Sequence, residues 1–158
     1  MGLSDALVEL TGALAGLTLA FQELRIVALA GLVTGISASF SMAASEFLAT
    51  KEENGSRSPI KAALFTGISY IVTVLLLVTP YLLLDNNSQV IFSLEPHLQA
   101  LIITFIIGLF IIALFNFYVS VAQDKSFKGK FIEMGFILLV VTFISFIIGL
   151  VLRESFGL

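Results

Sequence analysis

The chain contains no cysteine among its 158 residues, and only 12% of its residues are charged. Without cysteine it can form no disulfide, and it can hold no iron–sulfur cluster, haem or zinc ion through a thiolate. Its basic residues form no tract and are not interleaved with aromatic side chains, so nucleic acid is excluded as a partner. The net charge of −3 carries little information, because most charges lie in short segments between apolar stretches.

Apolar side chains dominate the rest of the composition. Hydrophobic residues make up 58% of the chain and the mean hydropathy is +1.08, values that are typical of a polytopic membrane protein. The N-terminal stretch "MGLSDALVEL" has no basic region and no cleavage site. We therefore expect the first apolar segment to be retained as a membrane span.

Five segments are expected to cross the bilayer as helices. Four stretches without charged residues or histidine approach or exceed the ~20 residues that cross ~30 Å of hydrocarbon. A fifth, at the N-terminus, is long enough only if Asp5 and Glu9 are counted inside it. The sequence thus predicts an all-α integral membrane protein with one transmembrane domain over residues 1–158 and no soluble domain. The spans are expected at about 4–22, 26–49, 61–84, 98–122 and 131–153.

The distribution of basic residues predicts the orientation of these spans. With five spans, the N-terminus and the loops after the second and fourth spans share one side of the membrane. That side holds six of the eight basic residues: Lys51, Arg57, Lys61, Lys125, Lys128 and Lys130. The other side holds only Arg25 and Arg153. The positive-inside rule therefore places the N-terminus in the cytosol and the C-terminus outside.

Four acidic residues lie within or at the ends of spans: Asp5, Glu9, Glu46 and Glu133. An ionised carboxylate in the middle of a lone membrane helix costs roughly 2.5–3.5 kcal/mol, so such a residue usually faces protein or water. Asp5 and Glu9 are four residues apart, as are Met42 and Glu46, so each pair shares one helical face. Because the second helix runs back, both pairs are expected near the cytosolic end. Carboxylates with a thioether favour Fe²⁺ or a similar ion over Mg²⁺ or Ca²⁺.

Each of these residues also has a simpler interpretation. Acids near a helix end often reach the lipid headgroups, Glu133 can pair with Lys128 or Lys130, and a methionine in a membrane helix usually packs. His97 is interpreted as the solvated start of a helix. Three serines that recur every four residues are interpreted as a small, hydrogen-bonding packing face: Ser37, Ser41 and Ser45.

The segment "SMAASEFLATKEE" resembles the second-helix motif of the vacuolar iron transporter family, in which a Ser-Met pair is followed by small residues and often an acid. The stretch "LSDALVELTGALAG" resembles the family's first-helix Asp-Gly-Leu motif, with Ala6 in place of the usual glycine. The resemblance extends over essentially the whole chain, including the "FIEMGFILL" start of the last span. It is closest to the membrane domain of fusion proteins that carry a ferritin-like domain ahead of it. It implies that Asp5 and Met42 line the metal pathway and that Glu46 matches an acid of many prokaryotic members.

Two departures from the family pattern bear on metal delivery. Plant and yeast-like members insert a glutamate-rich cytosolic domain between the second and third spans, where this chain has only "KEENGSRSP". The chain also begins four residues before Asp5, without the family's usual charged lead-in. We expect that a preceding ferritin-like domain was removed or belongs to another product, so that metal delivery needs a partner.

Two hypotheses of function follow, and neither is an enzyme. The first is a transporter in a prokaryotic plasma membrane that moves Fe²⁺, or Mn²⁺, out of the cytosol in exchange for protons. Its expected pathway ligands are Asp5, Met42 and Glu46, with Glu9 and Glu133 as auxiliary carboxylates; the metal is substrate, and no cofactor is bound permanently. The second is a non-transporting membrane anchor and dimerisation domain for a ferritin-like iron oxidase. An intramembrane hydrolase is disfavoured, because no span offers a Ser-His pair or paired aspartates.

Glycine spacing predicts close helix packing. "GALAG" places Gly12 and Gly16 on one face of the first helix, and "GLVTG" places Gly31 and Gly35 on one face of the second. One such face can serve the contact between these two helices. The other is free for a symmetric contact, so Gly12 and Gly16 are predicted at the interface of a homodimer. The alternative is that both faces pack helices within one subunit.

Overall fold

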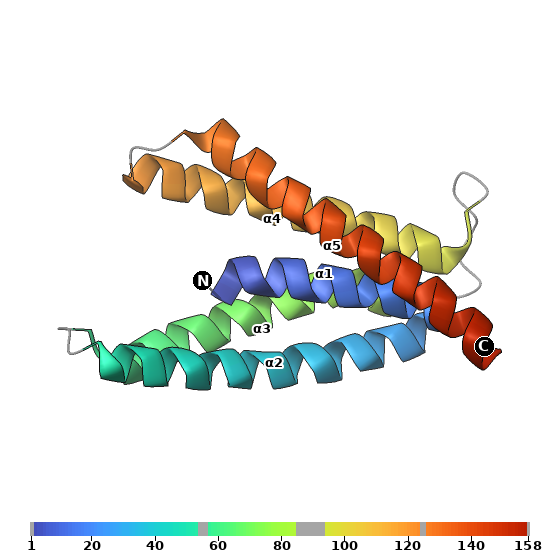
Figure 1. Cartoon of the computed structure of the whole chain (residues 1–158), viewed down its shortest axis with the longest axis horizontal. Helices are drawn as coiled ribbons and strands as arrows, with labels where there is room; N and C mark the ends of the chain where they lie inside the picture. Colours follow the sequence, from blue (N-terminus) through green and yellow to red (C-terminus); the bar gives the residue numbers. More distant parts are fainter. Residues whose placement is uncertain (1, 54–56, 85–93, 124–125, 158) are drawn as a thin grey trace.

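The computed structural model describes residues 2–53, 57–84, 94–123 and 126–157, which form a bundle of helices (Figure 1). The elements in chain order are α1 (Gly2–Phe21), α2 (Leu24–Glu52), α3 (Pro59–Leu83), α4 (Pro96–Gln123) and α5 (Phe127–Phe156). Each of these five helices is long and apolar enough to cross a membrane. The prediction of an all-helical chain with five such helices is confirmed, and each expected span overlaps one of them.

Local sequence signals mark the helix ends. Gln22, with φ of 53°, makes the left-handed turn between α1 and α2, and its N–H donates to the carbonyl of Thr18. The connection is so short that α2 must return antiparallel to α1. Pro59 stands at the first position of α3, where its missing N–H costs no helical hydrogen bond. Gly157, with φ of 66°, ends α5 and donates its N–H to the carbonyl of Arg153.

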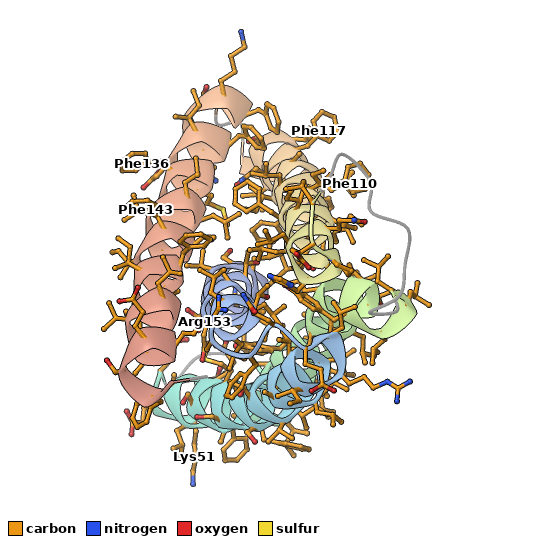
Figure 2. All side chains as sticks on the ribbon, turned by 90° about the vertical axis from the view of Figure 1, so that its right-hand side faces the viewer. Lys51, Phe110, Phe117, Phe136, Phe143 and Arg153 are labelled. Atoms are coloured by element: carbon orange, nitrogen blue, oxygen red, sulfur yellow. The ribbon has the colours of Figure 1, made fainter. Side chains whose placement is uncertain are left out.

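Helix α1 lies at the centre of the bundle and contacts each of the other four helices. Figure 1 shows α2 and α3 on one side of α1 and α4 and α5 on the other, and Figure 2 shows the bundle from its end. The inward leucines of α1, Leu7, Leu10 and Leu14, are at most 1% exposed. The helix that carries Asp5 is therefore the inner helix, and its position is fixed by packing on several sides.

The outer surface of the bundle is apolar. Phe110, Phe117, Phe136 and Phe143 point away from the helices (Figure 2), and each is 62–66% exposed. Contiguous apolar surface of this kind is rare on proteins in water, whereas in a bilayer it meets hydrocarbon. The surface and the helix lengths together indicate an integral membrane protein.

The two ends of the bundle differ in charge. Figure 1 shows the N-terminus and the ends of α2 and α4 toward one end of the bundle, and the C-terminus at the other. The basic residues described at or beside the N-terminal end are Lys51, Arg57, Lys61, Lys128 and Lys130, and Lys125 lies outside the described residues. The structure therefore keeps the charge asymmetry on which the predicted orientation depends, and the orientation itself stays a prediction.

The glycine face of α1 packs against α5 of the same chain. A Cβ atom built on Gly149 of α5 would collide with the backbone of Gly16, and a Cβ on Gly16 would lie 3.0 Å from the carbonyl oxygen of Ser145. A Cβ on Gly12 would lie 2.8 Å from a methyl carbon of Val141. The two helix backbones thus touch along a small-xxx-small face on each helix.

The second glycine face is also used within the chain. A Cβ on Gly31 would meet Leu14 of α1 at 2.7 Å, and one on Gly35 would meet Val74 of α3 at 2.6 Å. Both glycine faces therefore pack helices inside one subunit, which is the alternative given above for Gly12 and Gly16. The contact of Gly12 and Gly16 with a second copy of the chain stays a prediction.

Two minor interpretations are corrected. His97 does begin a helix, but its side chain is only 7% exposed, so it is buried rather than solvated. The serines predicted to pack are exposed in this chain: Ser37, Ser41 and Ser45. The buried serine of α2 is Ser39, four residues after Gly35, and its hydroxyl donates to the carbonyl of Ile36. Residues two apart lie on nearly opposite sides of a helix, so the face with Ser39 excludes Ser37 and Ser41, and Ser45 shares the face of Ser41, four residues before it.

Candidate metal site

Three helices line a cavity of about 480 Å³ near the N-terminal end of α1. The lining residues are Ser4, Asp5 and Val8 of α1, Met42 of α2, and Met134 and Ile137 of α5. The Asp5 side chain is exposed, and Met42 and Met134 are half-buried. The cavity therefore brings one carboxylate, one hydroxyl and two thioethers from three helices to one place.

Chain topology explains this arrangement. Asp5 lies in the first turn of α1, where the helix dipole favours a negative charge. The tight turn at Gln22 sends α2 back along α1, so that Met42, in the second half of α2, returns to the depth of Asp5. Met134 lies in the second turn of α5, which starts at the same end of the bundle. The predicted meeting of Asp5 and Met42 is thus present in the structure.

Glu9 is held by a different helix. The hydroxyl of Tyr70 in α3 donates to Oε2 of Glu9 at 2.7 Å, and Tyr70 is 0% exposed. Hydrogen bonds to a charged acceptor are stronger than those between neutral groups, so this bond orients the carboxylate. Glu9 lies one helical turn from Asp5 but does not line the cavity.

Met134 is also held by a buried group. The side-chain amide of Asn116 in α4 donates from Nδ2 to Sδ of Met134 at 3.3 Å, and Asn116 is 2% exposed. The neighbouring Glu133 is exposed and does not line the cavity. Consecutive helical residues point about 100° apart, so of this pair only Met134 faces the bundle.

The remaining predicted acid lies close to the site without forming part of its wall. Glu46 is half-buried, one turn beyond Met42 in α2, and does not line the cavity. Across the described ranges, no three His, Cys, Asp or Glu side chains stand close enough together to hold a metal ion. The expected cluster of several carboxylates is therefore not assembled within the described part of a single chain.

Sequence reasoning missed four residues of this region: Ser4, Tyr70, Asn116 and Met134. Tyr70 and Asn116 are polar residues inside otherwise apolar spans, and such residues are usually functional or paired. That signal could have found them. Met134 stands beside Glu133 in "FIEMGFILL", and of these two residues only the acid was predicted as a metal ligand.

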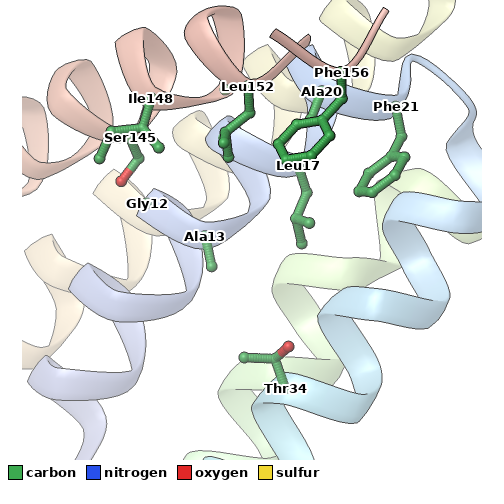
Figure 3. A pocket seen from close by; sticks show the side chains of 12 residues that line it. Gly12, Ala13, Leu17, Ala20, Phe21, Thr34, Ser145, Ile148, Leu152 and Phe156 are labelled. Carbon is green, nitrogen blue, oxygen red and sulfur yellow. The ribbon is translucent and has the colours of Figure 1, made fainter. Parts of the chain in front are cut away.

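A second cavity, also of about 480 Å³, lies further along α1 between α2 and α5 (Figure 3). Its walls include Ala13, Leu17 and Phe21 of α1, Thr34 of α2, and Ile148 and Leu152 of α5. Gly12 and Gly16 also line it, so the face of α1 that packs on α5 is still reached from this groove. The groove is almost wholly apolar, which suits a lipid or protein neighbour better than a metal ion.

The fold and the apolar surface define an integral membrane protein built from five helices, and its inner helix presents a carboxylate to a thioether-lined cavity. Residues 1–57 match the model of the VIT family. This segment comprises α1 and α2, and it carries both Asp5 and Met42. The match supports the resemblance of this segment to the vacuolar iron transporters. No curated protein matches the chain.

Proposed function

We propose that the chain transports Fe²⁺, or Mn²⁺, out of the cytosol in exchange for protons. The observation that supports this most directly is the cavity that Asp5 and Met42 share at the end of the bundle rich in basic residues. The positive-inside rule assigns that end to the cytosol. A metal ion from the cytosol would then meet Asp5 first, at the mouth of the inner helix.

The donor set suits a borderline divalent ion. Carboxylate oxygen binds hard and borderline cations, and thioether sulfur adds little for Mg²⁺ or Ca²⁺ but stabilises Fe²⁺ and similar ions. Because a metal ion competes with protons for a carboxylate, loading the site releases protons and unloading it takes them up. Asp5 can in this way couple metal movement to an opposing flow of protons.

The described residues of one chain bring one carboxylate to the cavity, and a second copy would double the set. We place the axis of a homodimer beside α1, where the apolar groove next to Gly12 and Gly16 offers a surface to a neighbour (Figure 3). Closed two-fold assemblies are the commonest oligomers. Two Asp5 carboxylates and two Met42 thioethers would then approach one path, and Glu46 would lie beside it.

The alternative function is a membrane anchor and dimerisation domain for a ferritin-like iron oxidase. It is favoured by the incomplete set of carboxylates in the described part of one chain. A ferritin-like domain, in cis or in trans, is also a partner of the proposed transporter, since it could load Fe²⁺ at the basic end. In either case we place the chain in a prokaryotic plasma membrane.

Transport by the purified chain in liposomes separates the two functions. A metal-sensitive dye inside the vesicles reports Fe²⁺ or Mn²⁺ entry. We expect Asp5→Asn to abolish entry, because it keeps the shape of the side chain and removes its charge. The matched control is Glu154→Gln, which also replaces a carboxylate by an amide but at the far end of α5, and which should transport at the wild-type rate. No entry with the folded wild-type chain supports the anchor, and normal entry with Asp5→Asn overturns the assignment of Asp5.

A further inference from the structure

Met134 meets three conditions for a metal ligand. It lines the cavity with Asp5 and Met42, it comes from a third helix, and its sulfur is oriented by the buried amide of Asn116. The hydrogen bond is 3.3 Å long from Nδ2 to Sδ. A thioether sulfur has two lone pairs, so accepting one hydrogen bond leaves the other for a cation.

Packing alone explains this pair poorly. An amide buried in an apolar bundle costs free energy unless it makes good hydrogen bonds, and a thioether is only a weak acceptor. A buried asparagine that donates to a methionine sulfur is therefore less favourable for packing than an apolar side chain of similar size. It becomes useful if the methionine, which has three rotatable side-chain bonds, must be kept in one orientation.

We propose that Met134 is a second thioether ligand of the metal pathway, positioned by Asn116, and that it ranks Fe²⁺ and Co²⁺ ahead of Mn²⁺. The inference rests on the proposed transport function and adds to it the basis of ion selection. With Met42 alone, the cavity offers one sulfur beside the Asp5 carboxylate and the Ser4 hydroxyl. With Met134 the cavity has two side chains with sulfur donors, as many as it has side chains with oxygen donors, which shifts its preference toward the more thiophilic ions.

The first test is selectivity in liposomes. Met134→Leu keeps the volume of the side chain and removes the sulfur. We expect entry of Co²⁺ relative to Mn²⁺ to fall about tenfold, or about 1.4 kcal/mol, while Mn²⁺ entry stays within about twofold of wild type. Met42→Leu should lower the same ratio. Asn116→Leu should lower it less, because the sulfur is still present but no longer oriented, as expected for a group that acts through a ligand.

The control is Ile132→Leu, a conservative change on the lipid-facing side of α5, where Ile132 is 68% exposed. It should leave the Co²⁺ to Mn²⁺ ratio unchanged. Equal loss of all ions in Met134→Leu, or an unchanged ratio, overturns the proposal, since a packing residue would give one of these results.

The second test is independent of transport. The chain contains three methionines, Met1, Met42 and Met134, so selenomethionine labels few positions. In labelled Met42→Leu protein loaded with Co²⁺, X-ray absorption should show Co–Se scattering from Met134. The double variant Met42→Leu/Met134→Leu keeps only Met1 and should show none. If the wild type moves no ion, transport fails while Co–Se scattering still supports Met134 as a ligand. Absence of Co–Se scattering in Met42→Leu refutes the ligand role.

Discussion

Replacing Gly149 by alanine should separate α1 from α5. The added Cβ would overlap the carbonyl group of Gly16, and neither can rotate away, because the carbonyl is part of the backbone and Cβ is bonded directly to it. The helices can relieve the overlap only by moving apart, which also loosens the contact between Gly16 and Ser145. We expect Gly149→Ala to lose transport because α1 carries Asp5.

The magnitude follows from overpacking. Adding a methyl group to a tightly packed contact costs typically 1–3 kcal/mol. Replacing glycine by alanine within a helix contributes up to about 1 kcal/mol in the opposite direction. Gly135, also in α5, isolates the two effects, since a Cβ built there meets no heavy atom within 4 Å. Gly135→Ala should therefore be neutral or slightly stabilising, and the difference between the variants should be about 1–3 kcal/mol.

Unfolding by SDS in mixed micelles measures this difference. The chain has no tryptophan and three tyrosines, of which Tyr70 and Tyr81 are buried. Near-ultraviolet circular dichroism of these rings should be lost when the bundle opens. Equal midpoints for Gly149→Ala and Gly135→Ala would refute the close backbone contact between α1 and α5.

Two further predictions concern the second copy and the remaining acid. Because the chain has no cysteine, Ala13→Cys introduces a unique thiol into the groove beside α1, and a bifunctional thiol reagent should link two copies. The control Leu139→Cys, on the exposed face of α5, should give far fewer linked copies. Equal yields of linked copies would place the dimer axis elsewhere. Glu46→Ala should abolish metal entry into liposomes while leaving the SDS midpoint unchanged, and wild-type entry would return Glu46 to an interfacial role.

The number of helices and their approximate places could be predicted from hydropathy, because the thickness of a bilayer fixes the length of an apolar helix. The central position of α1 could not. Hydropathy reports whether a segment can lie in lipid, but not which helices surround it. The clue was present in the composition of α1, because its two acids, Asp5 and Glu9, favour a surrounding of protein or water over one of lipid.

The candidate site was predictable only in part. The meeting of Asp5 and Met42 follows from a short turn between two antiparallel helices, which sequence spacing can anticipate. The arrival of Met134 cannot be anticipated in this way, because α5 reaches the cavity through contacts with α1 that depend on the glycines of both helices. Likewise, spacing alone could not assign the partner of the Gly12 and Gly16 face. A small-xxx-small pattern predicts that another helix backbone can approach closely, but it does not identify that helix.

The central position of α1 has a consequence for the biogenesis of the protein. During synthesis α1 emerges before the other four helices, and α5, whose Gly149 packs on Gly16, emerges after them. Helix α1 has the lowest mean hydropathy of the five spans, 1.3 against 2.9 for α5, so it is the segment that the insertion machinery retains least readily. Until α5 is inserted, the glycine face of α1 lacks the backbone against which it packs. A nascent chain that stalls before α5 therefore leaves α1, the least apolar of the five spans, without the helix whose backbone it touches.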